Sequence, residues 1–98
     1  MKIESITNAT TVTLKLTGLL DTASAPVLDA ELVNCLKGVT QLVLDFEALK
    51  YVSSAGLRVV LKAQKIMNTQ GSMKLIHVNN YIMEVLDATG FIDILTIE

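Results

Sequence analysis

Two adjacent serines, Ser53 and Ser54, are the residues of this sequence best placed to do chemistry. They follow an apolar run that ends at Glu47 and precede another that starts near Ala55. A serine at a helix start can accept a hydrogen bond from a first-turn N–H, worth about 1 kcal/mol. The same hydroxyl could carry a phosphoryl group, because a helix N-terminus offers unpaired N–H groups and partial positive charge. The residues alone leave both roles open, and capping or another structural hydrogen bond is the role expected of Ser53.

Basic residues follow Ser54 at helical spacing. Arg58, Lys62 and Lys65 stand four, eight and eleven positions after Ser54, which places them on one side of a helix. The simplest interpretation of this basic ridge is a solvated helix face. A phosphoryl group on Ser54 would add about 1.5 to 2 negative charges, and Arg58 could pair with them. The carrier would tolerate that charge, whereas a partner packed over the same surface would not.

The other reactive side chains have no partners at a spacing typical of catalysis or metal binding. Asp45 and Glu47, at the end of a strand-like run, are expected to be solvated rather than a catalytic pair. His77 has no cysteine or carboxylate at metal-ligand spacing, so no metal site is expected. Cys35 is expected to pack as a small apolar residue. Because Ser54 lacks an evident base, and no nucleophile elbow or phosphate loop is present, we expect neither an enzyme nor a cofactor.

Composition restricts the class of protein. The 98 residues are 51% hydrophobic and carry a net charge of −2, which fits one domain over residues 1–98 with a single core. The lack of a basic excess and the few aromatic residues argue against a nucleic-acid partner. One cysteine and no recognisable signal peptide point to a reducing, cytoplasmic setting. The apolar runs are far shorter than the roughly 20 residues that span a bilayer, so membrane insertion is not expected.

Hydrophobic periodicity predicts alternating strands and helices around the serines. The predicted strands cover residues 2–6, 12–16, 41–46, 73–78 and 92–97, and the predicted helices cover 22–37, 57–68 and 81–88. Strand 41–46 is nearly all apolar and is expected to be covered on both faces. Gly56 indicates a close approach of the helix start to the sheet. The order predicts an α/β domain with a mixed four- to five-stranded sheet, an N-terminal antiparallel hairpin followed by parallel strands, and about three to four helices.

The stretch LDFEALKYVSSAGLRVVL resembles the most specific motif of the STAS family, and within it the small single-domain anti-sigma factor antagonists. In that family an apolar strand leads into Asp-Ser-Ser/Thr/Ala-Gly-Leu, and the serine after the Asp position is phosphorylated. Ser54 occupies that position here, and Ser53 stands where the most typical members have Asp. The resemblance covers essentially the whole chain, including the order of its elements.

A second stretch, LTGLLDTASAP, is similar to the family's Gly-Glu-Leu-Asp loop between the second strand and the first helix. Gly18, Leu20 and Asp21 match that loop, whereas Leu19 stands where Glu is common. The resemblance implies that Asp21 lies beside Ser54 at a docking surface. The residues alone equally allow Asp21 to end the strand and help cap the next helix.

What the resemblance implies is a bacterial partner-switching regulator that is not itself an enzyme. The unphosphorylated form binds an anti-sigma factor with a histidine-kinase-like ATPase fold, which releases a sigma factor. That kinase phosphorylates Ser54 and the complex separates; a PPM-type serine phosphatase restores the binding form. The alternative is a STAS interaction module of a transporter or other signalling complex without phosphoswitching. The residues expected to contact the partner are Asp21, Ser53, Ser54, Gly56, Arg58 and Lys62.

Overall fold

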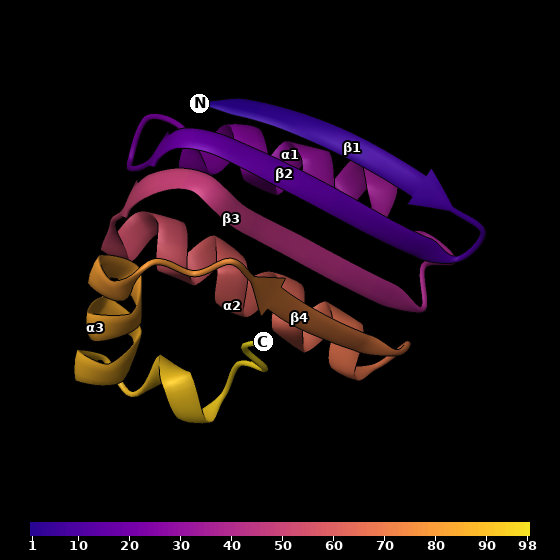
Figure 1. Cartoon of the computed structure of the whole chain (residues 1–98). Helices are drawn as coiled ribbons and strands as arrows, with labels where there is room; N and C mark the ends of the chain where they lie inside the picture. The colour runs from indigo at the N-terminus through magenta and orange to yellow at the C-terminus, as the bar shows by residue number, and fades with distance from the viewer.

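A four-stranded sheet in the order β1-β2-β3-β4 is the framework of the computed structural model, which describes residues 1–98 (Figure 1). Its strands are β1 (Lys2–Asn8), β2 (Thr11–Leu20), β3 (Gln41–Val52) and β4 (Ser72–Ile76). β1 and β2 pair antiparallel as a hairpin, and β2, β3 and β4 run parallel. The predicted mixed sheet with an N-terminal hairpin is therefore confirmed, with four strands.

Helices α1 (Ala25–Cys35) and α2 (Ser54–Asn68) connect the parallel strands, and α3 (Asn80–Ala88) follows β4. Figure 1 shows α1 and α2 on the same side of the sheet. The reason lies in the topology, because β3 and then β4 are added in one direction and right-handed crossovers then place both helices on one face. No helix of the chain is long and apolar enough to cross a membrane.

The core lies between this face of the sheet and the two helices. The inward side chains of β2 and β3 are fully or almost fully buried, and they are Val12, Leu14, Leu16, Leu20, Leu42, Leu44, Phe46, Leu49 and Val52. The opposite face of the sheet carries no helix in Figure 1. Even so, residues 42–46 are all buried, as expected for a strand covered on both faces. Val43 and Asp45, on that open face, are nevertheless buried, at 7% and 8% exposure. They lie on a central strand, between β2 and β4.

β3 continues to Val52, well beyond its predicted end at Phe46. Two irregularities in its pairing with β2 explain the difference. Lys15 faces Asp45 but Thr17 faces Ala48, so an extra residue bulges from β3, and a second shift follows after Gly18. Simple alternation of apolar residues fails across such bulges, because the buried positions move from every second to every third residue.

The predicted last strand, residues 92–97, is mostly wrong. Gly90 adopts a left-handed conformation with φ 79°, and a 3₁₀ helix, η1 (Phe91–Asp93), follows. Only Ile97 reaches the sheet, as one isolated parallel bridge to Leu75. Short apolar runs of this kind fit a strand or a helical turn equally well, so their periodicity could not distinguish the two.

Candidate functional site

Ser53 and Ser54 lie where β3 ends and α2 begins, and their roles differ. Ser53 is the N-cap of α2, with φ −94° and ψ 173°, and its hydroxyl oxygen accepts a hydrogen bond from the Gly56 N–H at 3.2 Å. The Ser53 N–H itself donates to the Leu20 carbonyl at 2.8 Å. Ser54 is the first residue of α2 and is exposed. The structural role expected of Ser53 is confirmed, and Ser54 presents its side chain to solvent.

The two serines should therefore respond differently to truncation. We expect Ser53→Ala to lower the free energy of unfolding by about 1 kcal/mol, because it leaves the Gly56 N–H without its acceptor. Ser54→Ala should change it by less than about 0.5 kcal/mol, as usual for an exposed site. Urea unfolding of both variants measures this difference. Equal destabilisation by the two substitutions would contradict the assignment of the cap to Ser53.

Gly56 allows α2 to start close to the end of β2. A Cβ atom at this position would lie 2.6 Å from the Leu20 Cγ and 2.9 Å from the Leu20 carbonyl oxygen. The predicted close approach of the helix start to the sheet is thus confirmed. Gly56 is also buried, which corrects the expectation that it contacts a partner directly. Its contribution to the site is to let Ser53 and Ser54 sit against the end of β2.

The basic ridge on α2 is exposed along its whole length, as its helical spacing predicts. Lys62 is not free, however, because its Nζ lies 2.8 Å from Asp29 Oδ1 on α1. Both side chains are substantially exposed, at 52% and 37%, so this ion pair contributes little stability, about 0–1 kcal/mol. Arg58, one turn after Ser54, has no ion pair in the chain and is the nearest ridge cation to the serine in helical spacing.

Asp21 organises the loop between β2 and α1. Its Oδ1 accepts hydrogen bonds from the backbone N–H groups of Ala23 at 3.1 Å and Ser24 at 3.0 Å. The Ser24 N–H contributes most to holding the pKa of the Asp21 carboxyl below its ordinary value, followed by the Ser24 hydroxyl, which also donates to Oδ1, and by the Ala23 N–H. Its contacts therefore support the structural alternative considered for Asp21. The loop begins immediately after Leu20, whose neighbour across the sheet is Val52, so it starts next to the two serines.

Large apolar side chains are exposed around the same end of the sheet. Leu19 and Tyr51 are neighbours on β2 and β3, and the rings of Tyr51 and Tyr81 stack with a centroid distance of 6.3 Å. Their exposed fractions are 49%, 39% and 50% for Leu19, Tyr51 and Tyr81. We call these three residues the apolar patch. Sequence reasoning missed it, because only the pairing of the strands and the packing of α3 bring these residues together.

Residues 2–98 match the model of the STAS domain. The chain belongs to the STAS family. One relative of this STAS domain is BtrV of Bordetella bronchiseptica, provisionally named an anti-sigma factor antagonist, which is 41% identical over 81% of the chain and 70% of BtrV. Another is the anti-sigma-B factor antagonist of Bacillus subtilis, which is 31% identical over 92% of the chain and 84% of the relative.

The fold of this STAS domain is also that of a solved anti-sigma factor antagonist, SpoIIAA. The unphosphorylated form of SpoIIAA superposes with a TM-score of 0.78 at 19% identity, over 99% of the chain and 87% of SpoIIAA. The phosphorylated form of the Bacillus protein superposes equally well, with a TM-score of 0.77 at 20% identity, over 99% and 91%. These similarities establish the fold in which Ser54 lies at the start of α2.

A second group of reactive side chains in the STAS domain lies on β3 and at the residue that follows its neighbour β4. His77 Nδ1 is 3.0 Å from Asp45 Oδ1 and 3.3 Å from Glu47 Oε2. The expectation that His77 has no carboxylate partner is therefore wrong, and Asp45 is buried rather than solvated. The parallel pairing of Asp45 with Ile76 places His77 beside it, a proximity that spacing along the chain could not reveal. These three residues, which we call the His77 cluster, are the set able to hold a metal ion.

Hydrogen bonds and charges within the His77 cluster raise the pKa of His77 and lower that of Asp45. The hydrogen bond to Asp45 is the main cause of the raised pKa of His77. The negative charges of Asp45 and Glu47 raise it further, and partial burial and the charge of Lys15 oppose the shift. Burial raises the pKa of Asp45, but the Glu47 N–H and His77 outweigh burial and leave that pKa lowered. A protonated His77 paired with an ionised Asp45 is therefore the favoured state at mildly acidic pH.

This ion pair should make stability depend on pH. The folded-state pKa of His77 is raised above 6.5. The contribution of His77 to the free energy of unfolding is therefore complete below pH 6.5 and is lost as the pH rises through the folded-state pKa. The contribution of Asp45 is present above pH 3.8 and is lost as the pH falls through its lowered value. In metal-free buffer we expect the unfolding free energy of the wild type, relative to that of His77→Asn, to fall as the pH rises above 6.5. Parallel pH profiles of the two proteins would contradict this.

Proposed function

We propose that this STAS domain is an anti-sigma factor antagonist whose binding is switched off by phosphorylation of Ser54. The observation that carries the proposal is the exposed Ser54 at the start of α2, at the same end of the sheet as the apolar patch. Both curated relatives have names that describe anti-sigma factor antagonists, and SpoIIAA has been solved in an unphosphorylated and a phosphorylated form. The domain acts by binding and is not itself a catalyst.

The apolar patch supplies the attractive part of the proposed interface. Exposed Tyr and Leu side chains gathered at one place are typical of protein-binding surfaces, because their burial removes apolar area from water. The partner that this function implies is an anti-sigma factor with a histidine-kinase-like ATPase fold. In this proposal it covers the patch together with Ser54 and the Asp21 loop, while Arg58 and Lys62 flank the contact with positive charge.

The start of α2 is suited to carry a phosphoryl group on Ser54. Of the first four N–H groups of α2, that of Ser53 binds the Leu20 carbonyl and that of Gly56 binds the Ser53 hydroxyl. The N–H groups of Ser54 and Ala55 have no intrahelical acceptor and remain available to phosphate oxygens. The modified domain therefore keeps its fold. The partner meets a group of about two negative charges that it would have to desolvate.

The switch also needs a kinase and a phosphatase. In the proposed cycle the anti-sigma factor transfers the γ-phosphoryl group of ATP to the Ser54 hydroxyl, and a PPM-type serine phosphatase hydrolyses the phosphoserine. Both reactions would take place in the cytoplasm, the compartment expected for this domain. The Ser54 hydroxyl is the phosphoryl acceptor in the first reaction and is regenerated in the second, and neither reaction needs a catalytic group of this chain.

Binding and phosphorylation can be tested together. The candidate anti-sigma factor is mixed with the unphosphorylated domain without ATP, and complex formation is measured by size-exclusion chromatography. ATP is then added, and intact mass and peptide mapping locate any phosphoryl group. The proposal expects a stable complex without ATP, modification of Ser54 with ATP, and loss of the complex. A stable complex that persists without modification indicates a STAS interaction module without phosphoswitching, and absence of any complex contradicts the antagonist function.

A further inference from the structure

We propose that the His77 cluster is a zinc-binding site formed by His77 Nδ1, Asp45 Oδ1 and Glu47 Oε2. The three donor atoms lie within 4.8 Å of one another, and two of their separations are 3.0 and 3.3 Å. Tetrahedral Zn²⁺ with bonds of about 2.0–2.2 Å holds neighbouring ligand atoms roughly 3.3–3.6 Å apart. Small side-chain adjustments thus bring all three atoms around one ion, and solvent supplies the fourth ligand.

The donor set is chemically matched to this metal. An imidazole nitrogen combined with carboxylate oxygens suits zinc, whereas magnesium and calcium prefer oxygen ligands alone. His77 is the only histidine of the chain, so no second imidazole competes for the ion. Zinc would replace the proton on Nδ1 and take the place of the direct His77–Asp45 hydrogen bond.

The backbone holds the donors near each other before any metal arrives. Asp45 is buried on β3, and its Oδ1 also accepts a hydrogen bond from the Glu47 N–H at 3.0 Å, which fixes the orientation of the carboxylate. An extra residue of β3 directly after Asp45 breaks the regular pairing with β2 at this point. His77 adopts φ 56°, a left-handed conformation that turns the chain just after β4. Two of the ligands therefore come from β3, and the third comes from the residue directly after the neighbouring strand β4.

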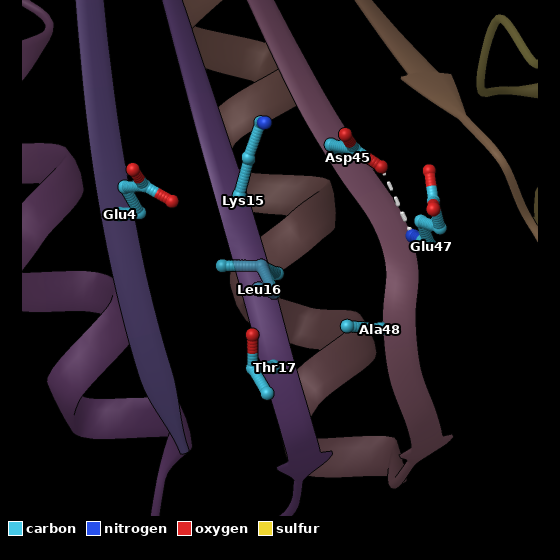
Figure 2. A pocket seen from close by; sticks show the side chains of 7 residues that line it. All are labelled: Glu4, Lys15, Leu16, Thr17, Asp45, Glu47 and Ala48. Atoms are coloured by element: carbon cyan, nitrogen blue, oxygen red, sulfur yellow. Dashed lines mark hydrogen bonds between the residues drawn. The ribbon is translucent and has the colours of Figure 1, made fainter.

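One positive charge opposes the metal. Figure 2 shows Lys15 on β2, between Glu4 on β1 and Asp45 on β3, at the hollow of about 180 Å³ on the open face of the sheet. The figure also shows Asp45 and Glu47 at the same side of that hollow, with the hydrogen bond from the Glu47 backbone N–H to the Asp45 carboxylate. Lys15 repels a cation at Asp45, so its removal should tighten zinc binding. If His77 and Asp45 form only an ion pair, the domain binds no zinc there, and removing Lys15 has no zinc affinity to change.

The test is titration of the folded domain with zinc chloride by isothermal calorimetry near neutral pH. All proteins carry Cys35→Ser, which removes the chain's one thiol as a competing ligand. We expect one zinc ion per chain. His77→Asn, whose side chain tolerates the left-handed backbone, and Glu47→Gln should each weaken binding on the order of tenfold or more. Lys15→Gln should strengthen it.

Two further measurements keep the result unambiguous. Circular dichroism of each variant without metal verifies that it is folded, and zinc should raise the Tm of the parent protein but not that of His77→Asn. The imidazole proton resonances of His77 should shift with zinc and return after addition of a chelator. Absence of saturable one-to-one binding, or equal affinity in the parent and His77→Asn, would overturn the site. Neither result bears on the proposed function at Ser54, because that test contains no zinc.

Discussion

Replacing Ser54 by Asp is expected to weaken the complex with the anti-sigma factor by roughly a hundredfold to a thousandfold, equivalent to about 3–4 kcal/mol. The cause is a permanent negative charge that the partner must desolvate beside the apolar patch. The fold should tolerate the same charge, because an acidic residue in the first turn of a helix is stabilised by the helix dipole, by about 0.3–1 kcal/mol. Binding is measured by surface plasmon resonance and stability by urea unfolding.

The controls separate charge at this site from charge in general. Ser54→Ala should bind like the wild type and resist phosphorylation. Asn34→Asp adds one charge to an exposed position near the end of α1. The end of α1 lies near the start of β3, at the opposite end of the parallel strands from Ser54, so affinity should not change. If Ser54→Asp binds as tightly as Ser54→Ala, the phosphorylation switch at this residue is wrong.

Gly71→Ala should be among the most destabilising single substitutions in this domain. A Cβ atom at Gly71 would lie 1.9 Å from the carbonyl oxygen of Thr40 and 2.6 Å from its carbonyl carbon. Both are backbone atoms that precede β3, so no side-chain rotation can relieve the overlap. The same carbonyl accepts the Ser72 N–H at 3.0 Å, and separating the segments would break that bond too. We expect a loss of about 3 kcal/mol and a fall in Tm of more than about 10 °C.

Gly38→Ala is the matched control for Gly71→Ala. It makes the same chemical change where nothing lies within 4 Å of the new Cβ atom. Because Gly38 has φ 76°, this substitution costs only the strain of a left-handed alanine, about 1–2 kcal/mol. Differential scanning calorimetry of both variants compares them directly. A Tm for Gly71→Ala equal to or above that of Gly38→Ala would show that the approach to Thr40 is not tight.

The local part of this fold could be predicted from the sequence because it depends on residues close together in the chain. The alternation of Val12, Leu14 and Leu16 placed the first half of β2, and helical spacing placed the basic ridge of α2 on its exposed face. The structural role of Ser53 and the close approach at Gly56 also followed from residue types next to a helix start. The family was recognisable from the motif around Ser54, since a short contiguous segment carries it.

The elements that sequence reasoning misread depend on pairing between distant segments. Two bulges in β3 shift its buried positions, so its continuation to Val52 was hidden. The segment after Gly90 forms a 3₁₀ helix and only one bridge at Ile97, although its apolar residues fit a strand. In both cases the outcome depends on how the segment pairs with a neighbouring strand, and the pattern of apolar residues along the chain does not reveal a bulge or the extent of that pairing.

The sequence by itself determined which side chains are available: a serine at a helix start, its basic ridge, and one histidine among few reactive groups. The tertiary structure alone decided which of them meet. It paired Lys62 with Asp29, stacked Tyr51 on Tyr81 beside Leu19, and brought His77 to Asp45 and Glu47. The physical reason is that composition and periodicity specify faces of elements, whereas contacts between residues some 30 positions apart arise only when strands and helices pack in one register.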